Sequence, residues 1–131
     1  FIKLKKSKDI KKVILCSGKV YFDLIEAREK LKRNDVIFYR IEQLYPFPVK
    51  SLVKELKPYA KNAKFYWCQE EPKNMGAWFS ARDYIQWTLD NIKANNNQIS
   101  YIGRSPDASP ATGYAKWHVS QQKEIIKKVF E

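Results

Sequence analysis

The sequence predicts an α/β fold in which a mostly parallel sheet is covered by helices on both faces. Short apolar runs alternate along the chain with longer segments whose apolar residues recur every three or four positions. This alternation is typical of strand–helix–strand units, which place helices over a parallel sheet. The length of 131 residues suits one domain with one hydrophobic core. We therefore expect residues 1–131 to form a single domain.

Four apolar runs, rich in β-branched and aromatic residues, are expected to form strands. They are residues 13–16, 36–41, 64–69 and 99–102. Glu70, Glu71 and Pro72 are expected to end the third strand, and Gly103 the fourth. Residues 1–6 alternate imperfectly between apolar and lysine residues, and we expect an edge strand there, because lysines discourage further pairing at a sheet edge. The αβ core then covers residues 12–131.

Four helices are expected to connect or follow these strands. The first runs from Val20 with apolar residues at helical spacing, and the second is opened by Pro48 and distorted at its end by Pro58. The turn at residues 74–76 is expected to start the longest helix of the domain, and a last helix covers about residues 115–129. The apolar stripe of the third helix consists of Trp78, Ala81, Ile85, Leu89 and Ile92.

The excess of lysine and arginine over acidic residues indicates a basic surface, but it does not indicate a specific nucleic-acid site. The formal net charge is +11, which by itself suggests anionic partners. However, six lysines lie within the first twelve residues, and lysines outnumber arginines 20 to 5, as in a general compositional bias. We therefore interpret most of the lysines as solvated surface rather than as phosphate ligands. No apolar run approaches the ~18 residues of a membrane span, so no membrane partner is expected.

Few residues are suited to catalysis or metal binding. Two cysteines and one histidine are too few for a zinc site, which needs about four such ligands. Cys16 and Cys68 lie inside apolar runs and are expected to be buried, reduced thiols. His118 has no acidic residue three or four positions away, so we interpret it as a packing or surface residue. Because the chain begins with Phe1 and its only methionine is Met75, we expect it to be a piece of a longer protein.

Polar residues at the carboxyl ends of the strands are the best candidates for a binding site. Open α/β sheets bind ligands at this edge, where Glu70 and Glu71 follow the third strand and Arg104 follows the fourth. Adjacent strand residues point to opposite faces, so the two glutamates are not expected to share one site. An ion pair or a helix contact is the favoured interpretation of these glutamates, and a ligand contact is the alternative. Asn74 is placed to cap the following helix.

Four longer motifs resemble one family, the last domain of 2-oxoglutarate dehydrogenase, the thiamine-dependent decarboxylating first component. They are VILCSGKVY at 13–21, RIEQLYPFP at 40–48, WCQEEPKNMGAW at 67–78 and YIGRSPDASPATGY at 101–114. They occur in the order of the family and extend over nearly the whole chain. The resemblance implies a transketolase C-terminal-like domain of three layers, α/β/α. Its sheet has five mostly parallel strands with an antiparallel edge strand, which residues 1–6 would supply in truncated form.

The resemblance also implies where the chemistry lies. In this family thiamine diphosphate and magnesium sit between two other domains, so no catalytic, cofactor-binding or metal-binding residue is expected in this chain. The parent enzyme decarboxylates 2-oxoglutarate in the tricarboxylic acid cycle and passes the succinyl group to a lipoyl group. The family places the strands of Cys16 and Cys68 side by side. We expect the enzyme in the bacterial cytoplasm, or in the mitochondrial matrix of a eukaryote.

The expected role of this chain is structural support and subunit contact. Its partners would be the other domains of the enzyme, a second subunit of a homodimer and the succinyltransferase component. Residues 46–48, Trp78 and the loop at 104–114 are the candidates for these contacts. One alternative is a regulatory anion or nucleotide site formed by Lys19, Asn74 and Arg104, and a less favoured one is a basic nucleic-acid module. The possible interface or anion-binding residues are Lys19, Glu70, Glu71, Asn74, Trp78 and Arg104.

Overall fold

The structure, a computed structural model, describes residues 1–106 and 115–131, with side chains omitted for residues 115–118. The predicted contacts of residues 107–114 and the predicted role of the His118 side chain lie outside this part of the chain. Of the helices that the structure describes, none combines the length and the apolar character needed to cross a bilayer.

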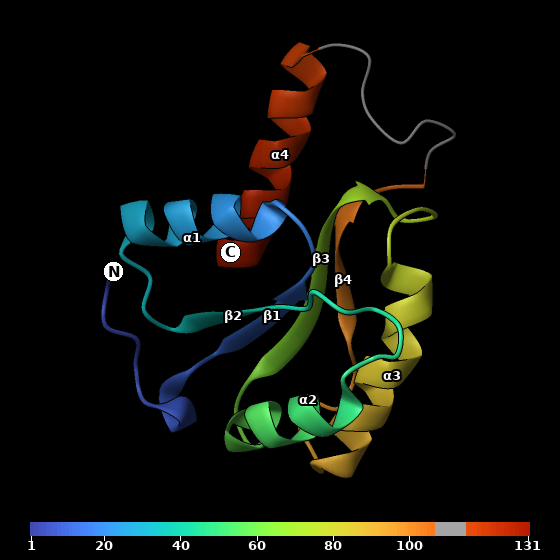
Figure 1. Cartoon of the computed structure of the whole chain (residues 1–131). Coiled ribbons are helices and arrows are strands. Elements are labelled where there is room, and N and C mark those ends of the chain that lie inside the picture. The colour runs from blue at the N-terminus through green and yellow to red at the C-terminus, as the bar shows by residue number, and fades with distance from the viewer. Residues whose placement is uncertain (107–114) are drawn as a thin grey trace.

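Four parallel strands form the sheet. They are β1 (Lys12–Cys16), β2 (Val36–Arg40), β3 (Lys64–Pro72) and β4 (Ser100–Arg104), and their order in the sheet is β2-β1-β3-β4 (Figure 1). The chain first moves from β1 to one side and then returns to build β3 and β4 on the other side. The direction therefore reverses between β1 and β3, which is the position where open parallel sheets form a crevice at their carboxyl ends.

Helices cover both faces of the sheet and give the predicted three layers. Helices α1 (Val20–Leu31) and α4 (Ala115–Phe130) lie on one face, and α2 (Val49–Leu56) and α3 (Trp78–Asn91) lie on the other (Figure 1). Two short 3₁₀ segments, η1 (Ser7–Asp9) and η2 (Lys57–Tyr59), precede β1 and follow α2. The distortion expected at Pro58 is thus present as η2. The α/β/α class and the four predicted helices are confirmed.

The predicted edge strand at residues 1–6 is wrong. The amide of Ile2 donates to the carboxylate of Glu29 at 2.8 Å, and the amide of Lys5 donates to the carbonyl oxygen of Asn34 at 2.9 Å. These bonds hold the segment against α1 and the loop after it, so its backbone does not pair with the sheet. The sheet of the described residues consequently has four parallel strands and no antiparallel one.

Two predicted strand ends and one predicted helix length also differ from the structure. Strand β3 continues past Glu70 to Pro72, because it stays paired with β4 after an irregularity between Cys68 and Pro72. Gly103 lies inside β4 instead of ending it. A Cβ atom at Gly103 would lie 2.4 Å from the Tyr101 hydroxyl oxygen, so glycine permits a close approach here. Helix α4 has 16 residues and α3 has 14, so α3 is not the longest helix.

The buried side chains agree with the predicted patterns. All five residues of the α3 stripe are buried, including Trp78, and they pack in the core between α2, α3 and the sheet. Cys16 and Cys68 are free and buried, and they are neighbours in the register of β1 and β3, as predicted. Burial raises the pKa of the Cys16 thiol to about 12 and raises the pKa of Cys68 as well. Both are therefore packing residues rather than reactive thiolates.

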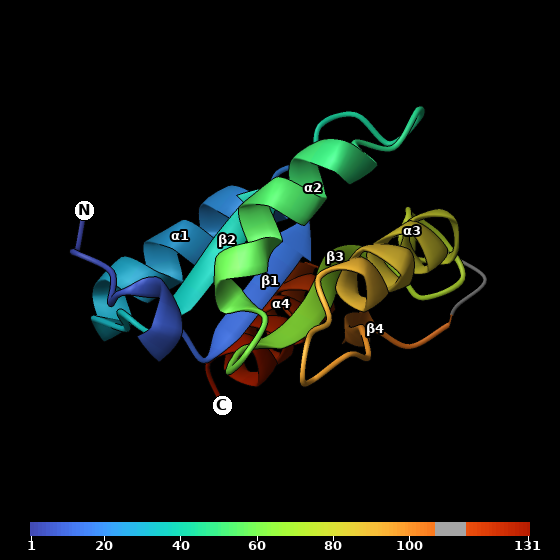
Figure 2. The same cartoon turned by 90° about the horizontal axis from the view of Figure 1, so that it is seen from below.

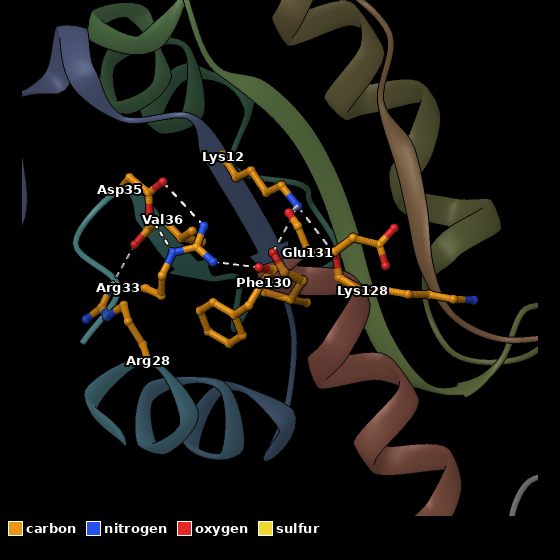
Figure 3. Close-up of polar contacts among 9 residues, drawn as sticks. Lys12, Arg28, Arg33, Asp35, Val36, Lys128, Phe130 and Glu131 are labelled. Carbon is orange, nitrogen blue, oxygen red and sulfur yellow. Dashed lines mark hydrogen bonds and ion pairs between the residues drawn. The ribbon is translucent and has the colours of Figure 1, made fainter. Parts of the chain in front are cut away.

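Two cations hold the end of α4 against the sheet (Figure 3). The ammonium of Lys12, on β1, donates to the carbonyl oxygens of Val129 at 3.1 Å and Glu131 at 3.0 Å. Arg33 donates to the carbonyl oxygen of Phe130 and pairs with Asp35 at 3.0 Å. The last carbonyl groups of a helix have no hydrogen-bond donor within the helix. At the end of α4, Lys12 and Arg33 supply donors to these carbonyl groups.

Candidate functional site

The carboxyl ends of β1 and β3 meet at a small hollow at the reversal point of the sheet. Its volume is about 230 Å³, and polar groups reach it from both strands and from α3. Ser17 and Gly18 follow β1, Glu71 belongs to the end of β3, and Ser80 lies in the first turn of α3. This is the edge at which the sequence predicted a site.

Gln69 organises this end of the molecule. Its side chain is buried, and its Oε1 accepts from the Trp67 indole at 2.9 Å and from the backbone amide of Trp78 at 3.1 Å. Its Nε2 donates to the carbonyl oxygens of Pro72 and Met75, both at 2.9 Å, and to that of Glu71 at 3.2 Å. A single amide thus shapes the turn between β3 and α3 and satisfies an amide in the first turn of the helix.

Gly76 is required by this arrangement. Its φ is +66°, which is a left-handed conformation that glycine adopts without strain. A Cβ atom there would lie 2.9 Å from a carboxylate oxygen of Glu71 and 3.0 Å from Oε1 of Gln69. The turn can therefore close over Gln69 only with glycine at this position.

Glu70 and Glu71 point to different sides of β3, as the sequence predicted. Glu70 accepts from the ammonium of Lys19 at 3.0 Å, on the side of α1. Glu71 lies with Gly76 and Ser80 in the hollow on the side of α3. The expected ion pair is thus present at Glu70, and the two carboxylates lie on different sides of β3 and do not form one acidic site.

Lys19 is electrostatically compensated by its neighbours. The hydrogen bond to Glu70 raises the pKa of Lys19, and Asp23 lies 3.9 Å away on the next turn of α1. Arg104 ends β4, which is separated from β1 by β3, so the structure does not place these two cations at adjacent strands. The anion site predicted to include Lys19 and Arg104 therefore stays a prediction, and the strand order does not support it.

The sequence predictions for Asn74 and Trp78 have different outcomes. The N-cap position of α3 is Ala77, and no side chain of that residue caps the helix, so the predicted cap by Asn74 is wrong. Instead, Gln69 binds the Trp78 amide. The Trp78 side chain is only 7% exposed and lies 5.4 Å from the ring of Tyr101, between ring centres. Its predicted burial in the core is confirmed, and a contact with other domains stays a prediction.

Exposed aromatic side chains gather on the outer side of α3. Tyr84 is half-exposed and stacks on Phe47, with ring centres 5.2 Å apart and planes 7° from parallel. Trp87, one turn further along α3, is 53% exposed, and Tyr45, two residues before Phe47, is 89% exposed. We call the exposed Tyr45, Tyr84 and Trp87, together with the buried Phe47 on which Tyr84 stacks, the aromatic face. Figure 1 shows the loop before α2 curving past α3.

The described residues do not fit thiamine diphosphate with its magnesium ion. Among them, no three histidine, cysteine, aspartate or glutamate side chains are grouped to hold a metal ion. The ammonium of Lys19, which follows Gly18 of the hollow in the sequence, is paired with Glu70. That the cofactor binds outside this chain stays a prediction.

Three residues that shape the candidate site or the aromatic face, Gln69, Tyr84 and Trp87, were not predicted from the sequence. Gln69 was read only as the last residue of a strand, although its polar side chain in an otherwise apolar run was a signal of a buried hydrogen-bond network. Tyr84 and Trp87 fall outside the apolar stripe of α3 and were not singled out. The helical period places Tyr84 beside the buried stripe and Trp87 on the opposite side of the helix, and these positions would have indicated exposed aromatic side chains.

Comparisons with known proteins agree with the geometry. The sequence model of the family described as 2-oxoglutarate dehydrogenase C-terminal matches residues 2–130. The 2-oxoglutarate dehydrogenase E1 components of Brucella anthropi and Brucella ovis are each 52% identical to this chain over 126 residues. That alignment covers 96% of this chain, and the chain spans only 12% of the length of these relatives.

A solved structure shows the same fold at low sequence identity. A split-gene transketolase, described as an inactive β4 tetramer, matches with a TM-score of 0.55 and 10% identity. The match covers 98% of this chain and 43% of the transketolase chain. It confirms the transketolase-like architecture of the sheet and its flanking helices.

Proposed function

The chain belongs to the 2-oxoglutarate dehydrogenase C-terminal family, and from this membership we propose that it is the structural and subunit-interface domain of such an enzyme. In this proposal the whole enzyme oxidatively decarboxylates 2-oxoglutarate in the tricarboxylic acid cycle. It then transfers the succinyl group to a lipoyl group of the succinyltransferase component. The names of the relatives, which are E1 components, support this assignment.

The proposal assigns the cofactor to other parts of the enzyme. Thiamine diphosphate and magnesium bind there, and this chain alone does not decarboxylate 2-oxoglutarate. The hydrogen bonds and ion pair at the carboxyl edge of the sheet support this division, because Gln69 and Glu70 are already engaged within the fold. In bacteria the enzyme acts in the cytoplasm, and in eukaryotes it acts in the mitochondrial matrix.

The observation that carries the interface role is the aromatic face. Tyr45 and Trp87 are mostly exposed although they are large and partly apolar. Tyrosine and tryptophan are enriched at protein interfaces, where they supply much of the binding energy. The stacked pair of Phe47 and Tyr84 fixes the loop to α3, so the exposed rings are held on a shaped surface. We propose that this face contacts another domain or the second subunit of a homodimer.

The test uses the full-length enzyme that contains this chain. In the double variant Tyr45→Ala and Trp87→Ala, we expect a weaker dimer in sedimentation velocity and a lower rate of 2-oxoglutarate decarboxylation. The matched control is Phe22→Ala, which removes an aromatic ring that is 57% exposed on α1, across the sheet. This control should leave both the sedimentation profile and the rate close to those of the parent enzyme.

The possible failures separate the two parts of the proposal. If the full-length parent enzyme shows no decarboxylation of 2-oxoglutarate, the assigned activity is wrong. If the parent is active and the double variant matches it in both readouts, the interface role of the aromatic face is wrong. An equal loss in the Phe22→Ala control would show a general effect of removing surface rings and would also overturn the interface role.

A further inference from the structure

Two basic segments that are far apart in the sequence meet at the amino ends of the strands, opposite the candidate site. The side-chain amide of Asn62 donates to the carbonyl oxygen of Lys8 at 2.9 Å, and the backbone amide of Lys64 donates to that of Lys11 at 2.9 Å. These bonds place η1 beside the turn that follows η2. Figure 2 looks at the molecule from this end, with η1 in dark blue and the turn in green.

The two segments carry an excess of positive charge, in which Lys11 also interacts with the carboxylate of Asp35. Residues 5–11 and 57–64 contain seven exposed lysines but only one carboxylate, that of Asp9. Among the residues that the structure describes, none of these seven ammonium groups forms an ion pair. We call these residues the lysine surface: Lys5, Lys6, Lys8, Lys11, Lys57, Lys61 and Lys64.

The lysine surface is hollowed rather than flat. A depression of about 660 Å³ is lined by four of its lysines, from residues 5–11, together with Asp9 and Asn62. A second depression of about 380 Å³ begins at Lys64 and continues along the loop at residues 95–98. Such hollows along a basic edge have room for a chain segment that lies across it.

Amide groups add hydrogen-bond acceptors to this edge. The side-chain nitrogen of Asn95 donates to the carbonyl oxygen of Lys61 at 3.0 Å, and that of Asn96 donates to the carbonyl oxygen of Ala63 at 3.2 Å. Both asparagines are exposed, and their amide oxygens have no recorded donor among the described residues. The edge thus combines ammonium donors with amide acceptors.

This combination suits an acidic polypeptide better than a nucleic acid. Carboxylates pair with ammonium groups, and backbone amides of a peptide donate to the asparagine oxygens, whereas a phosphate backbone offers no donor. Surfaces for single-stranded nucleic acids usually add aromatic rings for base stacking and arginine for bidentate phosphate contacts. The lysine surface contains no arginine. Of the nearby rings, those of Tyr59 and Phe65 are buried, and that of Tyr66, at the second depression, is half-buried.

We propose that the lysine surface is a docking site for an acidic segment of a partner protein. Clustered lysines of this kind attract an oppositely charged segment over about 10 Å in physiological salt and raise its rate of association. The site lies at the opposite end of the strands from the hollow of Glu71 and does not depend on the aromatic face. It therefore goes beyond the interface role proposed above.

The test measures binding of a fluorescent glutamate-rich peptide to the full-length protein by anisotropy. We expect binding that weakens with added salt, and a loss of affinity of about tenfold or more in the triple variant Lys6→Glu, Lys8→Glu and Lys11→Glu. The matched control is Lys50→Glu, Lys123→Glu and Lys127→Glu, which changes the net charge equally through exposed lysines of α2 and α4. The control should bind the peptide nearly as tightly as the parent protein.

Three outcomes would overturn the proposal. They are no binding by the parent protein, an equal loss in both triple variants, and tighter binding of a single-stranded DNA of the same charge than of the peptide. Thermal unfolding of each variant, followed by circular dichroism, shows whether it is folded. If the triple variant of Lys6, Lys8 and Lys11 is unfolded, Lys8→Gln replaces it. Lys8→Gln should lower the affinity for the peptide by a smaller factor, whereas Lys50→Gln should leave the affinity unchanged.

Discussion

Replacing Trp78 by alanine tests whether α3 is held to the sheet by its first residue. Trp78 is 7% exposed, its ring lies 5.4 Å from that of Tyr101 between centres, and its backbone amide is bound by Gln69. The indole nitrogen has no hydrogen-bond partner in the described part of the structure, so removing the ring leaves no buried group unpaired. The expected cost is therefore one of packing alone.

The magnitude follows from the size of the cavity. Removing a buried tryptophan typically costs about 3–5 kcal/mol, which includes the cavity that remains. The contact with Tyr101 accounts for about 0.5–1.5 kcal/mol beyond simple burial. A domain of this size has a total stability of about 5–15 kcal/mol, so the Trp78→Ala chain should fold but unfold at a clearly lower urea concentration.

The same helix supplies the control. Trp87 is also a tryptophan of α3, but it is 53% exposed and lies on the aromatic face. Trp87→Ala should change the free energy of unfolding of this chain by less than about 1 kcal/mol. Urea titrations of the parent and of both variants, followed by circular dichroism, give the midpoint and the slope of each transition.

Equal midpoints for the two variants would refute the reasoning. In particular, a Trp78→Ala midpoint within error of the parent, with an unchanged slope, would show that the indole is not part of the core. If Trp78→Ala fails to fold, Trp78→Phe keeps the test, because it retains most of the ring and should cost about 1–2 kcal/mol.

Three further predictions concern the polar groups. Gln69→Leu should cost about 2–4 kcal/mol because it leaves buried donors unpaired, whereas Gln43→Leu, at an exposed hydrogen bond, should cost less than about 1 kcal/mol in the same urea titration. Lys12→Met should lower the free energy of unfolding by about 1–3 kcal/mol, because the hydrogen bonds to the α4 carbonyl groups are lost. The control is Lys64→Met, at the exposed position on β3 that pairs with Lys12. An equal or larger cost for Lys64→Met would contradict the prediction. The hydrogen bond from Arg33 lowers the pKa of the Asp35 carboxyl. The ionised carboxylate of Asp35 therefore stabilises the fold at pH values above its unfolded-state pKa. This stabilisation is lost as the pH falls through its folded-state pKa. Melting temperatures between about pH 5 and pH 2 should therefore fall less steeply for Asp35→Asn than for the parent, and parallel curves would contradict the assignment.

The elements of the fold were predictable where burial repeats with a regular period. The run at residues 13–16 is apolar throughout because β1 lies between two strands and under helices on both faces. The α3 stripe repeats every three or four residues because only one side of that helix faces the core. In both cases the environment of each residue follows from its neighbours in sequence, so a local pattern suffices.

The edge segment and the end of α4 were not predictable in this way. Residues 1–6 have the alternation of a weak strand, but their amides bind Glu29 and Asn34, which are more than twenty residues away. Lys12 lies in a lysine-rich stretch that reads as solvated surface, yet it caps a helix more than one hundred residues later. Such contacts depend on the tertiary arrangement, and no local spacing encodes them.

The candidate site combines both situations, and Gln69 determines to which sides of β3 its two glutamates point. The amide of Gln69 binds Trp67 on one side and Trp78 on the other, so the backbone between them must leave β3, turn at Gly76 and enter α3. Held in this path, Glu70 is directed to Lys19 beside α1, and Glu71 is directed to the side of α3. A carboxylate pair that shared one proton or one metal ion would need both groups on the same side. The separation of the two carboxylates therefore supports the structural role proposed above for this chain.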